Sequence, residues 1–310
     1  MSASLSYCFR RRVLYSLGRA LLVLVFACAV IPEARARRQE DVPHSLVIRD
    51  IIYQHVGDRN LALDLYRPDN RPGPFPVIIW IHGGGWSAGR KEHCPAVMLL
   101  PDGYAIASIN YRLTRVAPFP AQIEDCKAAV RWVRANAGKY RLDPDKIGAW
   151  GHSAGGHLAA LLGTSGDVKE LEGNGDNLQV SSRVQAVCDV AGPADLVSMY
   201  QEVSGKSTEL GEKATAAIEA LIGGPLEQHK DTAVAASPIH YISKDDPPFL
   251  IIQGNEDETV PISQSLEFTK ALKAAGVPAV LDVASGRGHG VCGPQFEPTI
   301  RTFFSKQLKH

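Results

Sequence analysis

The chain has 310 residues, of which 45% are hydrophobic and 21% are charged, values typical of a globular protein that buries a sizeable core. Lysine and arginine together number 33, as do aspartate and glutamate together. This balance excludes the basic surplus of a typical nucleic-acid-binding protein, and the sequence has no acidic tail. We therefore expect no nucleic-acid partner.

The first 36 residues differ from the rest of the chain. A basic stretch, FRRRVLYSLGR, is followed by the apolar run ALLVLVFACAVIP and by an A-x-A sequence at Ala34–Ala36. This order is typical of a secretory signal peptide, and the apolar run is shorter than the roughly 18 residues of a membrane-spanning helix. We expect cleavage after Ala36, export to the periplasm or the exterior, and no stable membrane span. A lipoprotein site at Cys28 and a twin-arginine signal are the alternatives.

Beyond this segment we expect a flexible lead-in over 37–44 and one catalytic domain over 45–310. The alternating runs SLVIRDIIYQHV (45–56) and LALDLYRP (61–68), joined by GDRN, predict an antiparallel hairpin. The runs 76–83 and 104–113 are almost continuously apolar, as buried parallel strands are.

Apolar residues at helical spacing predict a helix over 120–140. The later predicted elements are strand 146–151, helix 154–163, strand 184–192, helix 209–223, strand 248–254, helix 262–276, strand 279–285 and helix 294–308. Alternating strands and helices predict an α/β fold, with a mostly parallel sheet and helices on both faces. The stretch 195–246 interrupts this alternation, and we expect it to form a small helical insert near the site.

The cysteines outside the signal sequence are widely spaced and form no C-x-x-C motif, which disfavours a zinc site. They are Cys94, Cys126, Cys188 and Cys292. Export permits disulfides, and burial as small hydrophobic residues is an equally good interpretation.

A candidate nucleophile, Ser153, lies in the sequence AWGHSAGGHLAAL (149–161), between a predicted strand and a predicted helix. In a G-x-S-x-G turn, the glycines permit a strained backbone that exposes the serine Oγ above the sheet. A serine hydroxyl is a poor nucleophile unless a base, held by a third group, lies within hydrogen-bond reach. The turn alone is equally compatible with a plain tight turn, so the interpretation depends on those partners.

A glycine loop, HGGGW (82–86), directly follows the strand run PVIIWI. Backbone N–H groups in such a loop point at a developing oxyanion, together with the N–H of the residue after the nucleophile. The candidate donors are Gly84, Gly85 and Ala154. The residues expected to support these turns are His82, Gly83, Gly151 and Gly155. A phosphate-binding loop is the alternative, but the G-K-[ST] and G-x-G-x-x-G patterns are absent from this loop.

The acid and the base follow from chain order, which in this architecture runs serine, acid, histidine. The loop NEDETVP after the strand FLIIQG offers an acid, and we choose Asp257, with Asp195 in reserve. His289, in the glycine-rich SGRGHGVCG after the last strand, is the predicted base. We expect His152 and His157, which flank the nucleophile, to be packing or hydrogen-bonded residues.

Five motifs in order, HGGGW, NYRL, GHSAGGHLA, GNEDETVPISQS and GHG, resemble those of the α/β-hydrolase superfamily. The resemblance covers roughly 45–308 and is to its esterase branch of feruloyl, acetyl-xylan and hormone-sensitive-lipase-like esterases. It implies the α/β-hydrolase fold, Ser153 as nucleophile, Asp257 as acid and His289 as base. The chain departs from this pattern in two ways. His152 and Asn255 stand where many relatives have Asp, and the region that usually forms a large cap is short.

We therefore expect a serine hydrolase that cleaves carboxylic esters through an acyl-enzyme, with no metal or organic cofactor. The resemblance favours short acyl chains, acetyl or feruloyl groups on polysaccharide included, so a small ester or an acylated carbohydrate is the expected substrate. The alternatives are an amide or formamide hydrolase, a peptidase of the same fold, and a non-catalytic binding protein.

Overall fold

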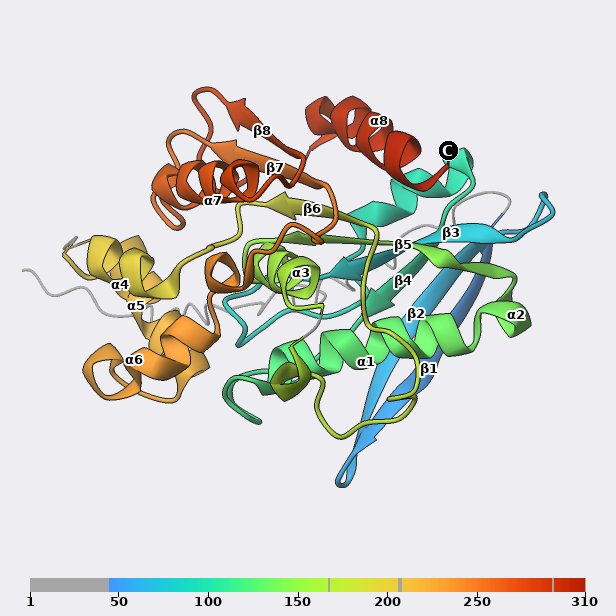
Figure 1. Ribbon diagram of the computed structural model, residues 1–310, viewed down its shortest axis with the longest axis horizontal. Coiled ribbons are helices and arrows are strands. Elements are labelled where there is room, and N and C mark those ends of the chain that lie inside the picture. Colours follow the sequence, from blue (N-terminus) through green and yellow to red (C-terminus); the bar gives the residue numbers. More distant parts are fainter. Residues whose placement is uncertain (1–44, 167, 206–207, 292, 310) are drawn as a thin grey trace, which may run out of the picture. The chain divides into compact units, whose positions relative to one another are not determined.

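The computed structural model describes residues 45–166, 168–205, 208–291 and 293–309, and within them eight strands form one sheet (Figure 1). The strand order is β1-β2-β4-β3-β5-β6-β7-β8. β1 pairs antiparallel with β2 and β2 antiparallel with β4, whereas the later pairs are parallel. The strands are β1 (Ser45–Val56), β2 (Arg59–Pro68), β3 (Phe75–Ile81), β4 (Ala105–Ile109), β5 (Leu142–His152), β6 (Ala186–Val190), β7 (Phe249–Gly254) and β8 (Ala279–Ala284).

This sheet confirms the predicted mostly parallel α/β architecture with an antiparallel hairpin at its start. The expected signal peptide (1–36) and lead-in (37–44) lie outside the described residues. β4, β6 and β7 are buried along their whole length, which explains why their sequences are apolar runs and not alternating patterns.

Helices cover both faces of the sheet, as predicted. One face packs against α1, α3 and α7, and the other against the 3₁₀ segment η1 and α8. None of the helices in the described ranges is long and apolar enough to cross a membrane. The helices of these two layers are α1 (Ala121–Ala135), α2 (Ala137–Tyr140), α3 (Ala154–Thr164), α7 (Ile262–Ala274) and α8 (Glu297–Leu308), with η1 at Pro95–Asp102, η2 at Lys169–Leu171 and η4 at Pro294–Phe296.

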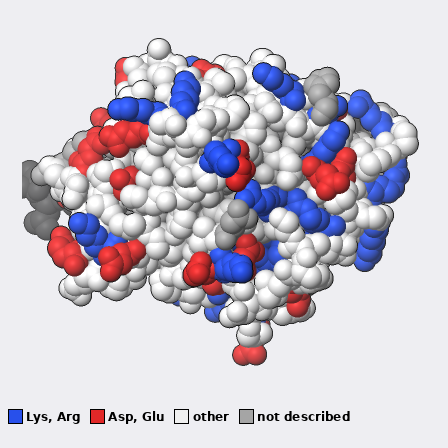
Figure 2. Space-filling model, viewed as in Figure 1, with Lys and Arg blue, Asp and Glu red and all other residues white. Residues whose placement is uncertain are grey.

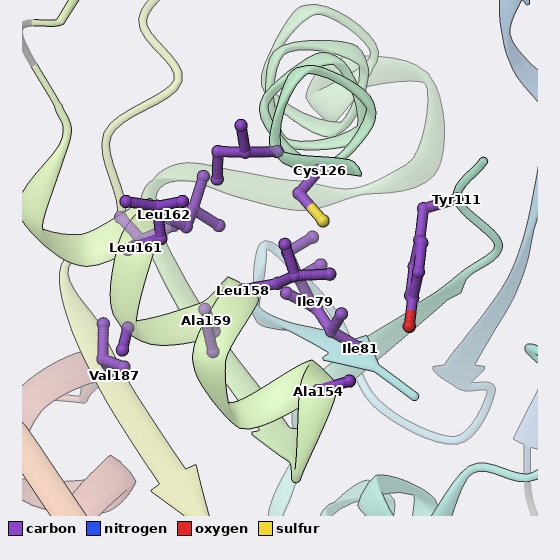
Figure 3. Packing of buried hydrophobic residues seen from close by; sticks show 14 of the residues in the cluster. Ile79, Ile81, Tyr111, Cys126, Ala154, Leu158, Ala159, Leu161, Leu162 and Val187 are labelled. Atoms are coloured by element: carbon purple, nitrogen blue, oxygen red, sulfur yellow. The ribbon is translucent and has the colours of Figure 1, made fainter. Parts of the chain in front are cut away.

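Helix α3, which follows the candidate nucleophile, is buried on all sides. Its apolar side chains lie between strand β3 and helix α1, beside Ile79, Ile81 and Cys126 (Figure 3). A helix that is buried along its whole length holds the turn before it rigidly against the sheet, because close-packed interiors leave little room for displacement.

The interruption at 195–246 forms the predicted helical insert. It contains α4 (Leu196–Ser204), α5 (Glu209–Ile222), α6 (Leu226–Ala235) and the 3₁₀ turn η3 (Pro238–Tyr241). The three α-helices contact one another and group at the left of Figure 1, away from α8. Of these, the sequence predicted only α5.

Two predicted elements are shorter than expected. The strand predicted over 104–113 ends at Ile109, because Tyr111 stacks on His82 and Arg112 turns toward the buried carboxylate of Asp125. The helix predicted over 120–140 breaks at Asn136, whose side-chain amide donates to the Trp132 carbonyl. A polar side chain that satisfies a helix-end carbonyl competes with helix continuation.

The described cysteines agree with the buried, hydrophobic interpretation. Cys94, Cys126 and Cys188 are each at most 1% exposed, and burial raises the pKa of the Cys94 thiol to about 12. Cys292 lies outside the described residues.

On the surface shown in Figure 2, acidic and basic side chains are interspersed with uncharged ones, in keeping with the balanced composition.

Candidate active site

Ser153 occupies a sharp turn between the end of β5 and the first residue of α3. Its backbone has φ +59° and ψ −123°, a left-handed region that costs a non-glycine residue about 1–3 kcal/mol. The turn is held from both sides: the Ser153 N–H donates to the Val190 carbonyl at 2.8 Å, and the Ser153 carbonyl accepts from the His157 N–H at 3.0 Å. The surrounding fold therefore keeps the serine in a conformation that it would not adopt by itself.

The glycines on either side of Ser153 are required by close backbone packing. A Cβ on Gly151 would collide with the carbonyl of Gly155, and a Cβ on Gly155 would collide with the carbonyl of Ile81. Both contacts are with main-chain atoms, which cannot rotate away as a side chain can. The first turn of α3 thus packs directly on the ends of β3 and β5, as the motif predicted.

The structure brings Ser153, His289 and Asp257 together across long stretches of sequence. His289 Nε2 lies 2.8 Å from Ser153 Oγ, and His289 Nδ1 lies 2.7 Å from Asp257 Oδ2. Because the carboxylate can only accept, Nδ1 carries a hydrogen and Nε2 of the neutral ring is free to accept the serine proton. The imidazole is 25% exposed, whereas the Asp257 carboxylate is fully buried.

Asp257 is held as an ionised acceptor. Burial alone would raise its pKa, but the hydrogen bond and charge of His289, together with the N–H groups of Val260 and Thr259, lower the pKa below its ordinary value of 3.8. Those two N–H groups donate to Oδ1 at 3.0 and 2.9 Å, respectively. The side-chain amide of Gln253 donates to Oδ2 at 2.9 Å, so both oxygens have a partner besides the imidazole.

The glycine loop lies against Ser153. A Cβ on Gly83 would approach the Ser153 Cβ to 3.3 Å and the His152 carbonyl to 2.7 Å. Gly84 and Gly85 have φ of +113° and +56°, conformations that favour glycine. The Gly84 carbonyl accepts from the N–H groups of Ser87 and Ala88, which turns the chain back. The loop therefore lies beside Ser153, the position from which N–H donors would have to reach a developing oxyanion.

Ala154, the third predicted donor, is the first residue of α3. The first N–H groups of a helix have no partner within the helix, and the helix dipole favours negative charge there. A developing oxyanion beside Ser153 would therefore meet both this helix end and the glycine loop.

His82 braces the glycine loop, as expected. Its ring stacks on Tyr111 with centroids 4.4 Å apart, and its Nδ1 lies 2.9 Å from the Gly83 carbonyl. The Tyr111 hydroxyl donates to the His82 carbonyl at 3.0 Å. Burial lowers the pKa of His82, which keeps the ring neutral at neutral pH.

A second buried histidine connects the glycine loop to the insert. The indole N–H of Trp86 donates to His157 Nδ1 at 3.2 Å, and His157 Nε2 lies 2.7 Å from the Ala236 carbonyl. The carbonyl must receive a hydrogen from Nε2, so the ring is the neutral Nε2–H tautomer. Burial lowers the pKa of His157 from 6.5 to about 4. This agrees with the expectation of a hydrogen-bonded packing residue.

Asp195, the reserve acid, is not part of this cluster. Its carboxylate caps the N-terminus of α4 by accepting from the N–H groups of Val197 and Ser198. Glu256 and Glu258, which flank Asp257, are exposed. No group of three or more metal-ligating side chains that could hold a metal ion occurs in the part of the chain that the structure describes.

The sequence analysis overlooked residues that support the cluster. Gln253 bridges Asp257 and Ser265, and a polar residue inside the apolar strand FLIIQG is the signal that would have found it. Asp189 is fully buried beneath the nucleophile turn, where a Cβ on Gly156 would collide with its Oδ1, and burial raises its pKa to about 7. An acid within the apolar strand β6 is a comparable signal.

Comparisons with known proteins identify related esterases. The BD-FAE family model matches residues 63–272. The chain is 34% identical over 237 residues to Esterase LipQ of Mycobacterium tuberculosis, an alignment that covers 74% of this chain and 54% of LipQ. The chain spans about half the length of the curated relatives that it matches.

Solved structures include similar chains. A bifunctional GH43-CE protein of Bacteroides eggerthii is 38% identical with a TM-score of 0.74, covering 84% of this chain and 38% of that one. A truncated carbohydrate esterase from gut microbiota is 32% identical with a TM-score of 0.74, covering 86% of this chain and 98% of that one. The chain therefore belongs to the BD-FAE family and has the α/β-hydrolase fold of the esterases that it resembles.

Proposed function

We propose that this protein is a serine hydrolase of carboxylic esters in which Ser153 is the nucleophile, His289 the general base and Asp257 the acid that orients it. The observation that carries the proposal is the continuous hydrogen-bonded chain from Asp257 through His289 to Ser153, with distances of 2.7 and 2.8 Å. Such a chain activates a hydroxyl that is otherwise a poor nucleophile. The named activities of esterase relatives support an ester as the substrate.

Acylation begins when Ser153 Oγ attacks the ester carbonyl carbon and His289 Nε2 takes the hydroxyl proton. The carbonyl π electrons move to its oxygen, and this oxyanion faces the N–H groups of Gly84, Gly85 and Ala154. Each such donor is typically worth about 3 kcal/mol in the transition state. The tetrahedral intermediate collapses, the C–O bond to the alcohol breaks, and His289 protonates the departing alcohol.

Deacylation repeats these steps with water. His289 takes a proton from a water molecule while the water oxygen attacks the acyl carbon, and the same N–H donors face the second oxyanion. Collapse breaks the bond to Ser153 Oγ, which recovers its proton from His289 and releases the carboxylic acid. Asp257 stays ionised throughout and stabilises the imidazolium that forms in each half.

The proposed substrate is a short-chain acyl ester, with acetyl or feruloyl groups on polysaccharide as the physiological class. The similarity to a carbohydrate esterase, which extends over 98% of that chain, supports an acylated carbohydrate. The His289 side chain is 25% exposed, and Gly84 is exposed. This exposure is compatible with a large alcohol group of the substrate remaining outside the protein.

We also propose that the protein is exported to the periplasm or the exterior and cleaved after Ala36. The basic, apolar and A-x-A segments over 9–36 support this proposal. N-terminal sequencing of the protein recovered from a secreting host tests it: a start at Arg37 supports cleavage, and an intact Met1 refutes it.

The activity is tested by hydrolysis of p-nitrophenyl acetate, butyrate and octanoate, by wild-type protein and Ser153→Ala. We expect kcat/KM to fall with chain length and the variant to lose activity. Mass spectrometry of wild-type protein quenched during turnover should show the mass of one acyl group on the peptide that contains Ser153. Acetylated xylan and methyl ferulate then define the physiological acyl group.

Equal activity of wild-type protein and Ser153→Ala would refute the assignment of the nucleophile. An inactive wild-type protein on every ester, with turnover of an aryl formamide or a peptide amide, would identify an amide hydrolase. Ser198→Ala is the matched control, because it removes a hydroxyl from the insert helix α4 without touching the cluster.

A further inference from the structure

His152, the residue before the nucleophile, contacts the backbone of the loop that carries the base. Its Nε2 lies 3.0 Å from the main-chain carbonyl of His289, and the two imidazole rings are 5.0 Å apart. A carbonyl oxygen only accepts hydrogen bonds, so Nε2 carries a hydrogen and donates it. The last residue of β5 is thereby tied to a residue 137 positions later in the chain.

The base loop (285–291) is also held by contacts with β7, β8 and the residues after β7, whereas His152 ties it to β5. Its exposed residues include Ser285, Gly286, Arg287, Gly288 and Gly290. Glycine-rich exposed segments lose more conformational freedom on ordering than other segments do. The loop's other main-chain contacts include Glu256 N–H to the Arg287 carbonyl at 2.9 Å and Val291 N–H to the His289 carbonyl at 3.0 Å. Neither of these contacts connects the loop to the strand that carries Ser153.

His152 also contacts the glycine loop. A Cβ on Gly83 would lie 2.7 Å from the His152 carbonyl and 3.5 Å from its Nδ1. The residue therefore lies where three functional segments meet: the glycine loop, the nucleophile turn and the base loop. Burial lowers the pKa of His152 below its ordinary value of 6.5, which keeps the ring neutral at neutral pH.

We propose that His152 is a positioning residue that sets the placement of the His289 imidazole over Ser153 Oγ through the hydrogen bond that it donates to the His289 carbonyl. It acts through His289 and touches no reacting atom. A displacement of about 1 Å in a catalytic group costs on the order of 100-fold in rate. Loss of this donor is therefore expected to act on kcat and to leave KM nearly unchanged, because the surface that binds the substrate is not altered.

The test compares full-length wild-type protein with His152→Leu and His152→Gln, using p-nitrophenyl acetate. Leucine fills the space without a donor, whereas glutamine retains an amide N–H that can reach the His289 carbonyl. We expect His152→Leu to lower kcat roughly 10- to 100-fold with little change in KM, and His152→Gln to recover most of the loss. His55→Leu, which removes an exposed imidazole from β1, is the matched control and is expected to keep wild-type kcat.

A second readout reports the geometry without turnover. We expect the proton between His289 Nδ1 and Asp257 Oδ2, which lie 2.7 Å apart, to give a downfield ¹H resonance when the imidazole is held in line. We expect this resonance to shift or broaden in His152→Leu and to return in His152→Gln. Thermal unfolding of each variant, followed by circular dichroism, separates this effect from a general loss of folded protein.

Two results would overturn the inference: wild-type kcat in His152→Leu, or equal losses in the Leu and Gln variants with unchanged melting temperatures. The inference rests on the proposed function, and the two fail differently. If wild-type protein hydrolyses no ester, the proposed function is wrong, and the ¹H resonance decides the positioning role: an unchanged signal in His152→Leu overturns it, and a shift that glutamine reverses supports it.

Discussion

Acidification should destabilise this protein through one buried histidine. His157 is fully buried as a neutral ring between Trp86 and Ala236, and its pKa is lowered from 6.5 to about 4. The unfolded chain binds a proton on this residue below about pH 6.5, whereas the folded chain stays unprotonated down to about pH 4. Stability therefore falls as the pH decreases through this window.

The magnitude follows from the size of the shift. Each unit of pKa difference is worth about 1.4 kcal/mol, and between about pH 7.5 and about pH 4.5 the linkage amounts to about 2.5 kcal/mol of unfolding free energy. His157→Gln keeps an amide that can accept from Trp86 or donate to Ala236, and it has no proton to gain. The difference in unfolding free energy between wild-type protein and this variant should therefore shrink by about 2.5 kcal/mol over the same range.

Urea unfolding of both proteins, followed by tryptophan fluorescence at each pH, measures this difference. All other titrating groups are shared and cancel, and His55→Gln on an exposed strand controls for the loss of an imidazole as such. Parallel pH profiles for wild-type protein and His157→Gln would refute the reasoning, as would an NMR titration that places the midpoint of His157 near 6.5.

Three further outcomes are expected. Asp257→Asn should lower kcat by about 10⁴-fold with an unchanged fold, because an amide at this position no longer selects the Nδ1–H tautomer of His289. Retention of more than a tenth of wild-type kcat in the p-nitrophenyl acetate assay would contradict the assignment of Asp257. Burial raises the pKa of Asp189 to about 7, so the folded protein binds this proton more tightly than the unfolded chain, and the resulting stability is lost as the pH rises from about 4 to about 7. In urea unfolding, the unfolding free energy of Asp189→Asn should rise by up to about 4 kcal/mol relative to that of wild-type protein between acidic and mildly alkaline pH. Equal pH profiles for the two proteins would count against this. Gly155→Ala should yield little folded protein, measured as soluble yield and melting temperature, because its Cβ would collide with the Ile81 carbonyl; Gly138→Ala, with nothing near its Cβ position, is the control.

The pattern of apolar runs was sufficient to predict the order of the strands along the chain and most helices around them. Continuous apolar runs such as 248–254 can be stable only when both faces of a strand are covered, so they identify buried parallel strands. The strand-to-helix turn at Ser153 was also predictable, because a serine between glycines at such a boundary reflects local backbone constraints. Helices α4 and α6 were not predicted. α6 is short and buries only Leu226 and Ala233, so its periodic signal is weak. α4 has buried apolar residues at helical spacing, Leu196, Met199 and Val203, and this signal was overlooked.

The sequence by itself determined which residue types were available to the site and in which order they occur along the chain. It did not decide which acid accepts the hydrogen bond from His289, because Asp257 and Asp195 both follow strands. Only the tertiary structure places Asp257 beside the imidazole and Asp195 at the N-terminal cap of α4. The supporting contacts of Gln253 and His152 were likewise decided by tertiary structure. The physical reason is that these contacts join residues from different strands and loops, whose approach depends on the packing of the whole sheet, whereas sequence patterns report constraints within a single element.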